Sequence, residues 1–448
     1  MSLIRPQLEA PVALPESEVR ARSIFRQAVF VAILLVVYIS TRPYYVQPEG
    51  TILSSDPLNQ VAFLGLACLA VIGLIMADHR AMLPVLQPSY ALLFLLMGSS
   101  VVMSTQFGIS FRAFGFTAIV MFLAASLYAM PERFSQFQKL LLLSALGVMA
   151  FSYFGIIALP DSAKHTDFDP FEPEHAGSWK GHFDHKNIAG ATMGCFAIMG
   201  LYALRIGKNW IGAILLIGGF LFVYFTKSKT SLALLPLAML LGILAERIPS
   251  LILRLLICLT PVFTLISLTI GGVLVPWISA MNKAVMKDPT FTGRFDIWRY
   301  GFEMLAQRPW QGYGFEGFWQ TSTTLQGESR LELAWAVEKI IHGHNSYLDV
   351  ALTLGVPGLL LVLYIFVVKP VLDYHACQPT DENRKIATMF LTIILFVSLG
   401  MCLETYYFRR SDPVWFTLLI AVIGLRFTAA YRFDQSPSPG DPAPARAG

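Results

Sequence analysis

The chain has 448 residues, of which 55% are hydrophobic and only 14% are charged, and its mean hydropathy is +0.59. Soluble domains carry about 25% charged residues, so these side chains are too few to cover a water-facing globule of this size. The net charge of +4 is too small to indicate nucleic acid as a partner. The composition therefore excludes a soluble enzyme, a coiled coil and a disordered chain, and it predicts a polytopic membrane protein.

Apolar runs long enough to cross about 30 Å of hydrocarbon predict an all-α, polytopic transmembrane bundle of about 12 helices. The first run lacks a small-residue cleavage site after its apolar core, so we expect an uncleaved helix rather than a signal peptide. The runs lie at 24–41, 58–77, 86–104, 109–130, 138–159, 187–205, 209–226, 230–246, 251–275, 346–369, 385–403 and 412–430.

These runs divide the chain into five parts. We expect a cytoplasmic segment at 1–23, nine helices within 24–275, a large loop at 276–345, three helices within 346–430 and a Pro-rich, disordered cytoplasmic tail at 431–448. A second outer loop lies at 160–186, between the fifth and sixth helices.

The large loop is too long to be structureless and carries helix signals. Thr292 can cap a helix from Arg294 to about Gln307, which Pro309 and Gly312 would end. A second helix is expected near 331–341. The loop therefore predicts a mostly helical cap on the outer surface.

Orientation follows from the distribution of Lys and Arg. An even number of helices places both termini on one side, and that side receives 17 Lys and Arg, against nine opposite once the long loop is set aside. Cytoplasmic loops carry the excess of positive charge, and long loops count little. We therefore expect cytoplasmic termini and both long loops on the outer face.

The predicted spans carry almost no charge through their middles. Ionisable residues inside a bilayer are costly and mark transport routes, so their scarcity argues against an ion-coupled pump. Polar residues gather instead at the outer ends of helices, in four motifs at 181–187, 226–231, 292–296 and 342–349.

Three cations in these motifs stand where outward-to-inward helices begin, and helix N-termini favour anions. Lys186, Lys229 and Arg294 could converge on one phosphate-bearing group, while a nearby histidine removes a proton from an attacking hydroxyl. Such a site suits displacement of a diphosphate from a lipid-linked substrate. The alternatives are that both lysines anchor the chain to lipid headgroups, that Arg294 pairs with a cap carboxylate, and that His182 and His342 are structural.

Two further patterns are weaker. Residues 312–317 fit G-x-G-x-x-G, but no βαβ unit surrounds them, so we expect a glycine-aromatic turn rather than a dinucleotide site. The D-x-D at 167–169, with His165 and His175 nearby, could hold a divalent cation, although a solvated acidic loop is the better interpretation. We predict no metal site and no cofactor.

The four motifs together resemble the O-antigen ligase and polymerase family of bacterial envelope glycosyltransferases, and within it the ExoQ-like branch that polymerises exopolysaccharide. The resemblance covers roughly 175–360. It is carried by WKGHFDHKNIAG (179–190), TKSKTSLALL (226–235), TGRFDIWRYGFEMLAQRPWQGYGFEGFW (292–319) and HNSYLDVALTLGVPG (344–358).

The resemblance implies a GT-C-like bundle in the bacterial inner membrane that transfers a glycan from undecaprenyl diphosphate to a sugar hydroxyl at the periplasmic face, with inversion and without a metal. It implies that His344 is the base or acceptor-orienting group and that Arg294 is a diphosphate ligand. Lys229 stands where ligases of the family typically have arginine, which favours the polymerase branch, because lysine cannot grip phosphate bidentately. Lys186 would also bind diphosphate, and the secondary site residues would be His185, His342, Asn345 and Tyr347.

Three alternatives remain open at this point. A ligase would use the same donor but join the glycan to lipid A–core. A lipid-glycan transporter would need charged or broken helices at mid-membrane. A non-catalytic assembly partner would bind polysaccharide export or copolymerase proteins. The expected partners are thus the lipid-linked donor, the acceptor, membrane lipid and such export proteins.

Overall fold

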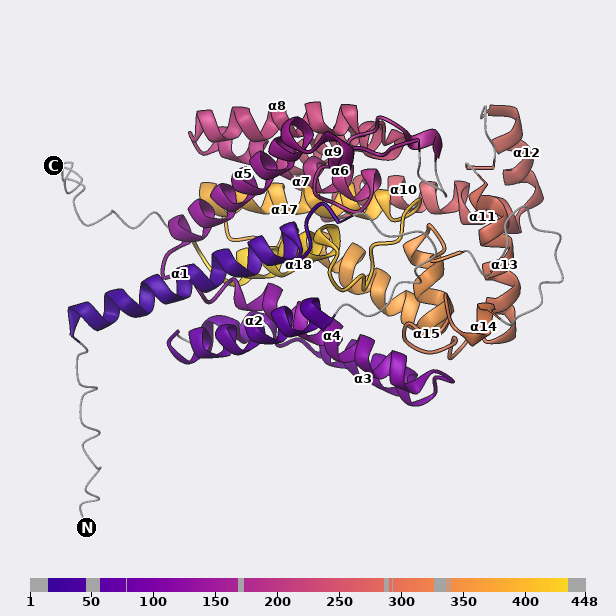
Figure 1. Cartoon of the computed structure of the whole chain (residues 1–448), viewed down its shortest axis with the longest axis horizontal. Coiled ribbons are helices and arrows are strands. Elements are labelled where there is room, and N and C mark those ends of the chain that lie inside the picture. The colour runs from indigo at the N-terminus through magenta and orange to yellow at the C-terminus, as the bar shows by residue number, and fades with distance from the viewer. Residues whose placement is uncertain are drawn as a thin grey trace, which may run out of the picture.

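The computed structural model describes residues 15–45, 57–77, 79–167, 173–285, 290–291, 293–325, 337 and 340–433 (Figure 1). Regular structure within these ranges is helical, and the β-type pairing in them is one isolated antiparallel bridge between Lys164 and Trp179.

Ten helices in the described ranges are long and apolar enough to span a membrane. Two shorter apolar helices, α3 (Pro88–Val102) and α8 (Asn209–Phe225), accompany them. Every predicted apolar run falls on one of these helices, so the prediction of an all-α, multi-pass membrane protein is confirmed. The ten are α1 (Glu16–Ile39), α2 (Pro57–Ile75), α4 (Phe107–Ser126), α5 (Phe134–Ala158), α7 (Lys186–Arg205), α9 (Lys229–Arg247), α10 (Leu251–Leu268) continued by α11 (Ile270–Leu274), α15 (Ser346–Leu363) continued through a π-helical turn (Tyr364–Val368) by α16 (Lys369–His375), α17 (Asp381–Gly400) and α18 (Pro413–Ala430).

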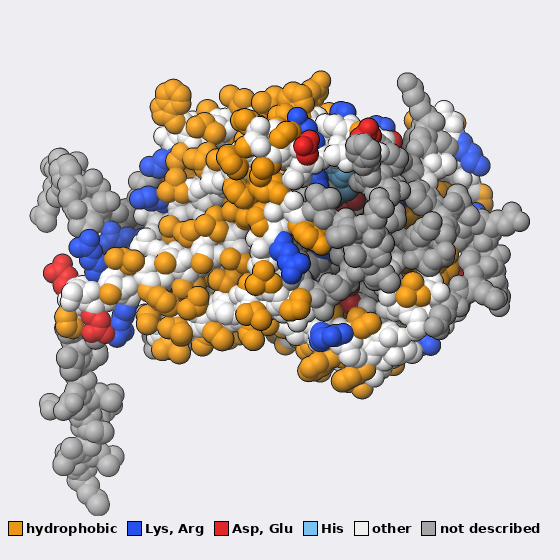
Figure 2. Space-filling model, in the orientation of Figure 1, with side chains coloured by type: hydrophobic (Ala, Val, Ile, Leu, Met, Phe, Trp, Pro, Cys, Tyr) orange, Lys and Arg blue, Asp and Glu red, His pale blue; other side chains and the backbone are white. Residues whose placement is uncertain are grey.

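Three helices form the centre of the bundle. In α7, α17 and α18, 78%, 89% and 83% of the apolar window is buried, whereas the figure for α10 with α11 is 17%. The centre therefore lies at α7, α17 and α18, and α10 lies at the margin. Figure 2 shows hydrophobic side chains over much of the bundle face in view, as a lipid-facing surface requires.

Loops predicted to share the positively charged side do lie together. Arg26 of α1 pairs with Glu132 in the α4–α5 loop at 2.7 Å. Arg205 at the end of α7 and Arg384 at the start of α17 both pair with Glu246 at the end of α9, at 2.6 and 3.6 Å. The chain thus passes back and forth between this face and an opposite one. Which compartment each face meets stays a prediction.

The opposite end carries the cap, with α12 (Pro276–Val285), α13 (Arg294–Gln307) and α14 (Ser322–Leu325) beside the start of α15 (Figure 1). The bounds predicted for the Arg294–Gln307 helix are confirmed. Its N-cap is Gly293, with φ 79°. Thr292 and most of the helix expected near 331–341 lie outside the described residues.

The 312–317 stretch is a turn docked onto a break in α15. At Gly355 the backbone leaves helical geometry, with φ 71° and ψ 179°. Cap backbone takes over the freed groups: Val356 N–H donates to Pro309 O at 2.8 Å, and Tyr313 N–H donates to Leu352 O at 2.8 Å. A Cβ on Gly355 would lie 2.2 Å from Trp310 O, so only glycine permits this approach. The break is filled by protein backbone, which differs from the ion-coordinating breaks of transporters.

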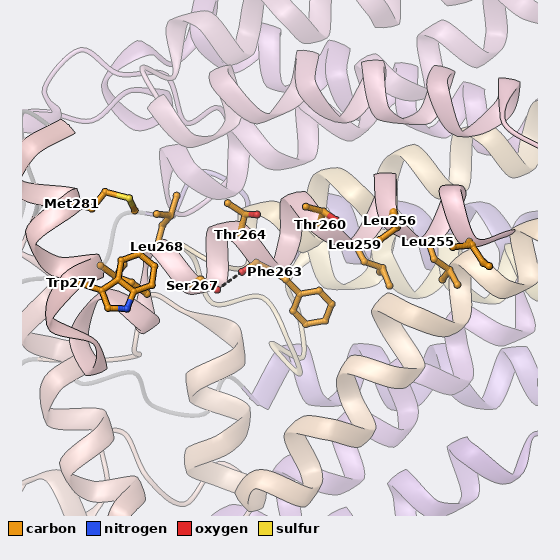
Figure 3. Close-up of a pocket in the computed structure, with 12 residues that line it drawn as sticks. Leu255, Leu256, Leu259, Thr260, Phe263, Thr264, Ser267, Leu268, Trp277 and Met281 are labelled. Carbon is orange, nitrogen blue, oxygen red and sulfur yellow. Dashed lines mark hydrogen bonds between the residues drawn. The ribbon is translucent and has the colours of Figure 1, made fainter. Parts of the chain in front are cut away.

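An apolar groove of about 730 Å³ runs along α10, on the side that faces away from the centre of the bundle (Figure 3). Leu255 and Leu256 line one end of it, and Trp277 and Met281 of α12 line the other. The chain turns at Thr269 between α10 and α11, which brings α12 over the end of the groove.

Candidate functional site

The starts of α13, α15 and α7 converge at the cap end on one carboxylate. Glu404, in the loop after α17, accepts a hydrogen bond at Oε1 from Arg294 Nη2 at 2.7 Å and another from Asn187 Nδ2 at 2.8 Å. His344 Nδ1 lies 3.5 Å from the other oxygen, Oε2. Three of the four polar motifs therefore meet at Glu404, although more than 200 residues separate Asn187 from it.

Glu404 is buried and stays ionised. Burial alone would raise its pKa, but the Arg294 guanidinium and the neighbouring His344 and His185 imidazoles more than offset that effect and hold the pKa at about 2. The ion pair is therefore intact at neutral pH. Because Arg294 uses Nη2 for it, other donors of the guanidinium fork remain for a ligand.

His344 is held in an unusual backbone conformation. Its φ is 49°, in the left-handed region that a non-glycine residue occupies only when its surroundings enforce it. On one side, Trp298 Nε1 of the cap donates to Gly343 O at 2.9 Å. On the other, Asn345 caps α15, accepting from the N–H groups of Tyr347 and Leu348. Such strain is characteristic of functional positions.

Asp349 fixes the loop that carries His344. Its carboxylate accepts from Gly343 N–H at 3.1 Å, from Trp319 Nε1 at 2.7 Å and from Thr405 Oγ1 at 2.6 Å. A Cβ on Gly343 would lie 2.4 Å from Asp349 Oδ1, so the loop needs glycine here. One side chain thus joins the His344 loop, the cap and the loop that carries Glu404.

Two predicted secondary site residues have their polar groups engaged in the fold. Asn345 is fully buried, and besides capping α15 its Nδ2 donates to Cys402 O at 2.8 Å. Tyr347 is also buried, and its hydroxyl donates to Ser398 O at 2.9 Å. Both side chains therefore position α15 against α17 and the loop after it, and their role as secondary site residues stays a prediction.

His342 lies against His344. Its Nδ1 accepts from His344 N–H at 3.3 Å, and the two rings are 4.2 Å apart. Burial, together with His344, Arg409, Arg294 and His185, lowers the pKa of His342 well below its ordinary value. His342 is therefore neutral at pH 7.

Two histidines cap the start of α7. His185 Nδ1 accepts from Asn187 N–H at 3.1 Å, and His165 Nε2 accepts from Lys186 N–H at 3.2 Å. The rings of His165, His175 and His185 lie 5.1 to 5.7 Å apart. The capping nitrogens of His165 and His185 are therefore engaged by the start of α7. Asp169 of the D-x-D lies outside the described residues.

The two lysines differ in their surroundings. Lys186 is buried at the first position of α7. Lys229 is exposed at the first position of α9 and makes no ion pair within the described part of the chain. The first turns of α9 and α7 touch, since a Cβ on Gly190 would lie 3.0 Å from Ser231 Oγ. Lys229 therefore begins a helix beside the cluster without contacting Glu404.

His182 belongs to the fold. Its Nε2 donates to Tyr38 O at 2.8 Å, its Nδ1 accepts from Ser152 Oγ at 2.8 Å, and the ring is buried. Burial lowers its pKa to about 4. The alternative that His182 is structural agrees with these contacts.

The low pKa of His182 predicts an acid limit on stability. Because the folded-state pKa lies below the ordinary 6.5, the unfolded chain binds the proton more tightly, and stability falls as pH drops from about 6.5 to about 4. The full loss is about 3 kcal/mol. Thermal unfolding of purified protein across this range should show a smaller decline in His182→Gln than in wild type. His375→Gln, an exposed histidine beside Arg254 at the other face, should decline like wild type; equal curves for all three proteins would contradict the assignment.

Sequence reasoning missed Glu404 and Asn187 as site residues. Asn187 stands within the 181–187 motif, but that motif alone predicts no role for it. The available signal for Glu404 was its place as a lone carboxylate directly after the apolar run 385–403.

The chain is similar in sequence to a known family and to a known protein. Residues 191–363 match a family model described as O-Antigen ligase. The chain is 26% identical over 293 residues to the "Exopolysaccharide production protein ExoQ" of Rhizobium meliloti (strain 1021). The aligned region covers 62% of this chain and 65% of the length of that relative. Lys229, Arg294 and His344 lie inside the family match, whereas Asn187 and Glu404 lie outside it. The chain is therefore a multi-pass membrane protein whose residues 191–363 match the O-antigen ligase family model and which is similar, over part of both chains, to an exopolysaccharide production protein.

Proposed function

We propose that this protein is a glycosyltransferase that moves a glycan from undecaprenyl diphosphate to a sugar hydroxyl at the periplasmic face of the inner membrane, polymerising exopolysaccharide or O-antigen repeat units. The observation that carries the proposal is the meeting of Arg294, His344 and Asn187 at the buried Glu404. The O-antigen ligase domain and the rhizobial relative support the class of reaction.

In the proposed reaction His344 is the general base. Nδ1 lies on the Glu404 side, so Nε2 takes the proton from the acceptor hydroxyl and the carboxylate stabilises the imidazolium that forms. The acceptor oxygen bonds to the anomeric carbon while the bond from that carbon to the diphosphate oxygen breaks. Attack from the opposite face inverts the configuration, and His344 later releases the proton to water.

Arg294 acts on the leaving group. As the glycosidic bond breaks, negative charge develops on the diphosphate oxygen, and a preorganised guanidinium stabilises it. The dipole of α13, whose first residue is Arg294, adds to this effect. No metal is needed when fixed cations supply this stabilisation.

The test is reconstitution. Purified protein in lipid vesicles, given undecaprenyl-diphosphate-linked repeat units, should form a ladder of longer glycans. It should release one undecaprenyl diphosphate for each glycosidic bond that forms. Activity should persist in excess chelator. A protein that extends no lipid-linked unit, yet moves such units across the vesicle, would favour the transporter alternative and overturn the proposal.

The second candidate is ligation onto lipid A–core, which the description of the matched family favours. Donor chemistry is the same, and the acceptor differs. Purified lipid A–core and lipid-linked repeats should therefore be supplied in competition. Product mainly on lipid A–core would assign the ligase role, and a repeat-unit ladder would assign the polymerase role.

Lys229 is expected to attract the diphosphate through charge. Lys229→Ala should raise the KM for the lipid-linked donor about tenfold, because a charge-assisted hydrogen bond is lost. Lys229→Arg should restore or exceed wild-type affinity. The control is Lys227→Ala, which removes a neighbouring cation whose Nζ donates to Ala176 O at 3.4 Å. Equal KM values for the two alanine variants would contradict the proposal that Lys229 binds the donor.

A further inference from the structure

The loop between α17 and α18 presents two adjacent arginines from a rigid turn. Phe408 is buried with φ 59°, in the left-handed region, and its ring packs 5.3 Å from that of Trp415. Arg409 N–H donates to Tyr406 O at 3.2 Å, and Asp412 N–H donates to Arg409 O at 2.9 Å. The backbone of Arg409 is therefore fixed on both sides.

The two arginines have different partners. Arg410 Nη2 lies 3.9 Å from Glu316 Oε2 in the cap. Arg409 is half-buried, and within the part of the chain that the structure describes its side chain makes no ion pair and no hydrogen bond. Its guanidinium donors are therefore available to a ligand at a partly desolvated position.

The charge of Arg409 acts on the same segments that meet at Glu404. Tyr406, whose carbonyl accepts from Arg409 N–H, donates its own N–H to Ser346 Oγ at 2.8 Å, so this loop lies against the start of α15. Burial raises the pKa of Asp184, in the segment before α7, and of Asp412, in the same loop, and the charge of Arg409 opposes that rise. The Asp412 carboxylate is already engaged, since it accepts from Val414 N–H at 2.7 Å and from Trp415 N–H at 3.2 Å to cap α18. Burial, His344 and then the charges of Arg409 and Arg294 lower the pKa of His342, so both guanidinium groups act on the His344 loop.

Charge balance shows why a further cation matters. Arg294 and Glu404 form a pair with no net charge, and His342 is neutral at pH 7. A diphosphate carries two anionic phosphoryl groups, so a neutral pair and the single charge of Lys229 leave part of its charge unbalanced. Arg409 offers a full positive charge, with its fork of donors available for bidentate contact with phosphate.

We propose that Arg409 is a second diphosphate ligand of the donor site, holding one phosphoryl group while Arg294 holds the other. This inference rests on the proposed glycosyltransferase function. Arg409 then binds the donor and the departing undecaprenyl diphosphate through charge, whereas Arg410 secures the loop to the cap.

The experiment compares Arg409→Gln and Arg409→Lys with the matched control Arg410→Gln. Binding of undecaprenyl diphosphate to purified protein in lipid nanodiscs is measured by direct titration, together with kcat and KM for lipid-linked repeats. Arg409→Gln should weaken binding at least tenfold and raise KM, Arg409→Lys should fall between it and wild type, and Arg410→Gln should stay within twofold of wild type. Thermal unfolding of each variant reports whether the loop remains folded.

The outcomes separate this inference from the function it rests on. If wild type forms the glycan ladder and Arg409→Gln binds undecaprenyl diphosphate as wild type does, Arg409 is not a ligand and the proposed function stands. Equal loss in Arg409→Gln and Arg410→Gln also overturns the inference, since loop geometry would then explain both. If wild type neither binds undecaprenyl diphosphate nor extends lipid-linked glycan, both proposals fail together.

Discussion

His344→Ala should reduce glycan extension by about 10²–10⁴-fold, the usual contribution of a positioned general base. The imidazole is lost while its neighbours keep their own contacts, because Asn345, Asp349 and Trp298 hold the surrounding backbone. The measurement is ladder formation from lipid-linked repeats by purified protein, at matched protein amounts. Binding of undecaprenyl diphosphate should change little, because Arg294 keeps its pair with Glu404.

His375→Ala is the control for this change. His375 lies beside Arg254 at the opposite face, where its Nδ1 is 2.8 Å from Arg254 Nη1. Its loss should leave extension within twofold of wild type. If His344→Ala formed long-chain product at the wild-type rate, the proposal that His344 is the general base would be wrong.

Glu404→Gln should reduce turnover about 100-fold, the order of loss expected when reacting groups are displaced by about 1 Å. The substitution removes the charge that pairs with Arg294 and faces His344. Glu404→Ala should be worse, because breaking a buried pair from one side costs about 3–5 kcal/mol of stability. Turnover and thermal unfolding of the two variants measure these effects.

A double-mutant cycle isolates the pair. Arg294→Ala and Glu404→Ala should not be additive, because each alone leaves the other charge buried without its partner. The control is Glu316→Gln, which alters a partly exposed cap carboxylate 3.9 Å from Arg410 and should stay near wild type. Additive losses would mean that Arg294 and Glu404 act separately.

The pKa of about 2 fixes how the pair responds to acid. Because it lies below the ordinary Glu value of 4.5, the stabilisation is complete above about pH 4.5 and is lost only as pH falls toward 2. An activity loss between pH 7 and 5 must therefore arise from another group than Glu404.

The helices could be predicted from the sequence because each depends on local information. The spans are continuous apolar runs. The helix α13 begins at Arg294 and ends before Pro309, as the local helix-start and helix-stop residues predict. α1 begins at Glu16, before the predicted 24, because Glu18 and Arg22 pair at i and i+4 on a polar first stretch outside the apolar run.

The site could be predicted only in part. Helix starts rich in cations indicated Arg294 and His344, but the carboxylate that joins them lies 60 residues beyond His344 in another loop. Such a pairing depends on how α17 packs against α15, which no local pattern records. The same limit applies to Asn345 and Tyr347, which the motif predicts as secondary site residues: a motif reports proximity in the chain, whereas the contacts of their polar atoms with α17 and the loop after it depend on packing.

Arg294 and His344 belong to the segment shared with the O-antigen ligase family, while Asn187 and Glu404 come from stretches before and after it. A chimera that grafts only residues 191–363 onto a relative would thus inherit the guanidinium and the imidazole but depend on a foreign carboxylate. Exchange of specificity between relatives should succeed only when the graft also carries the stretches that contain Asn187 and Glu404.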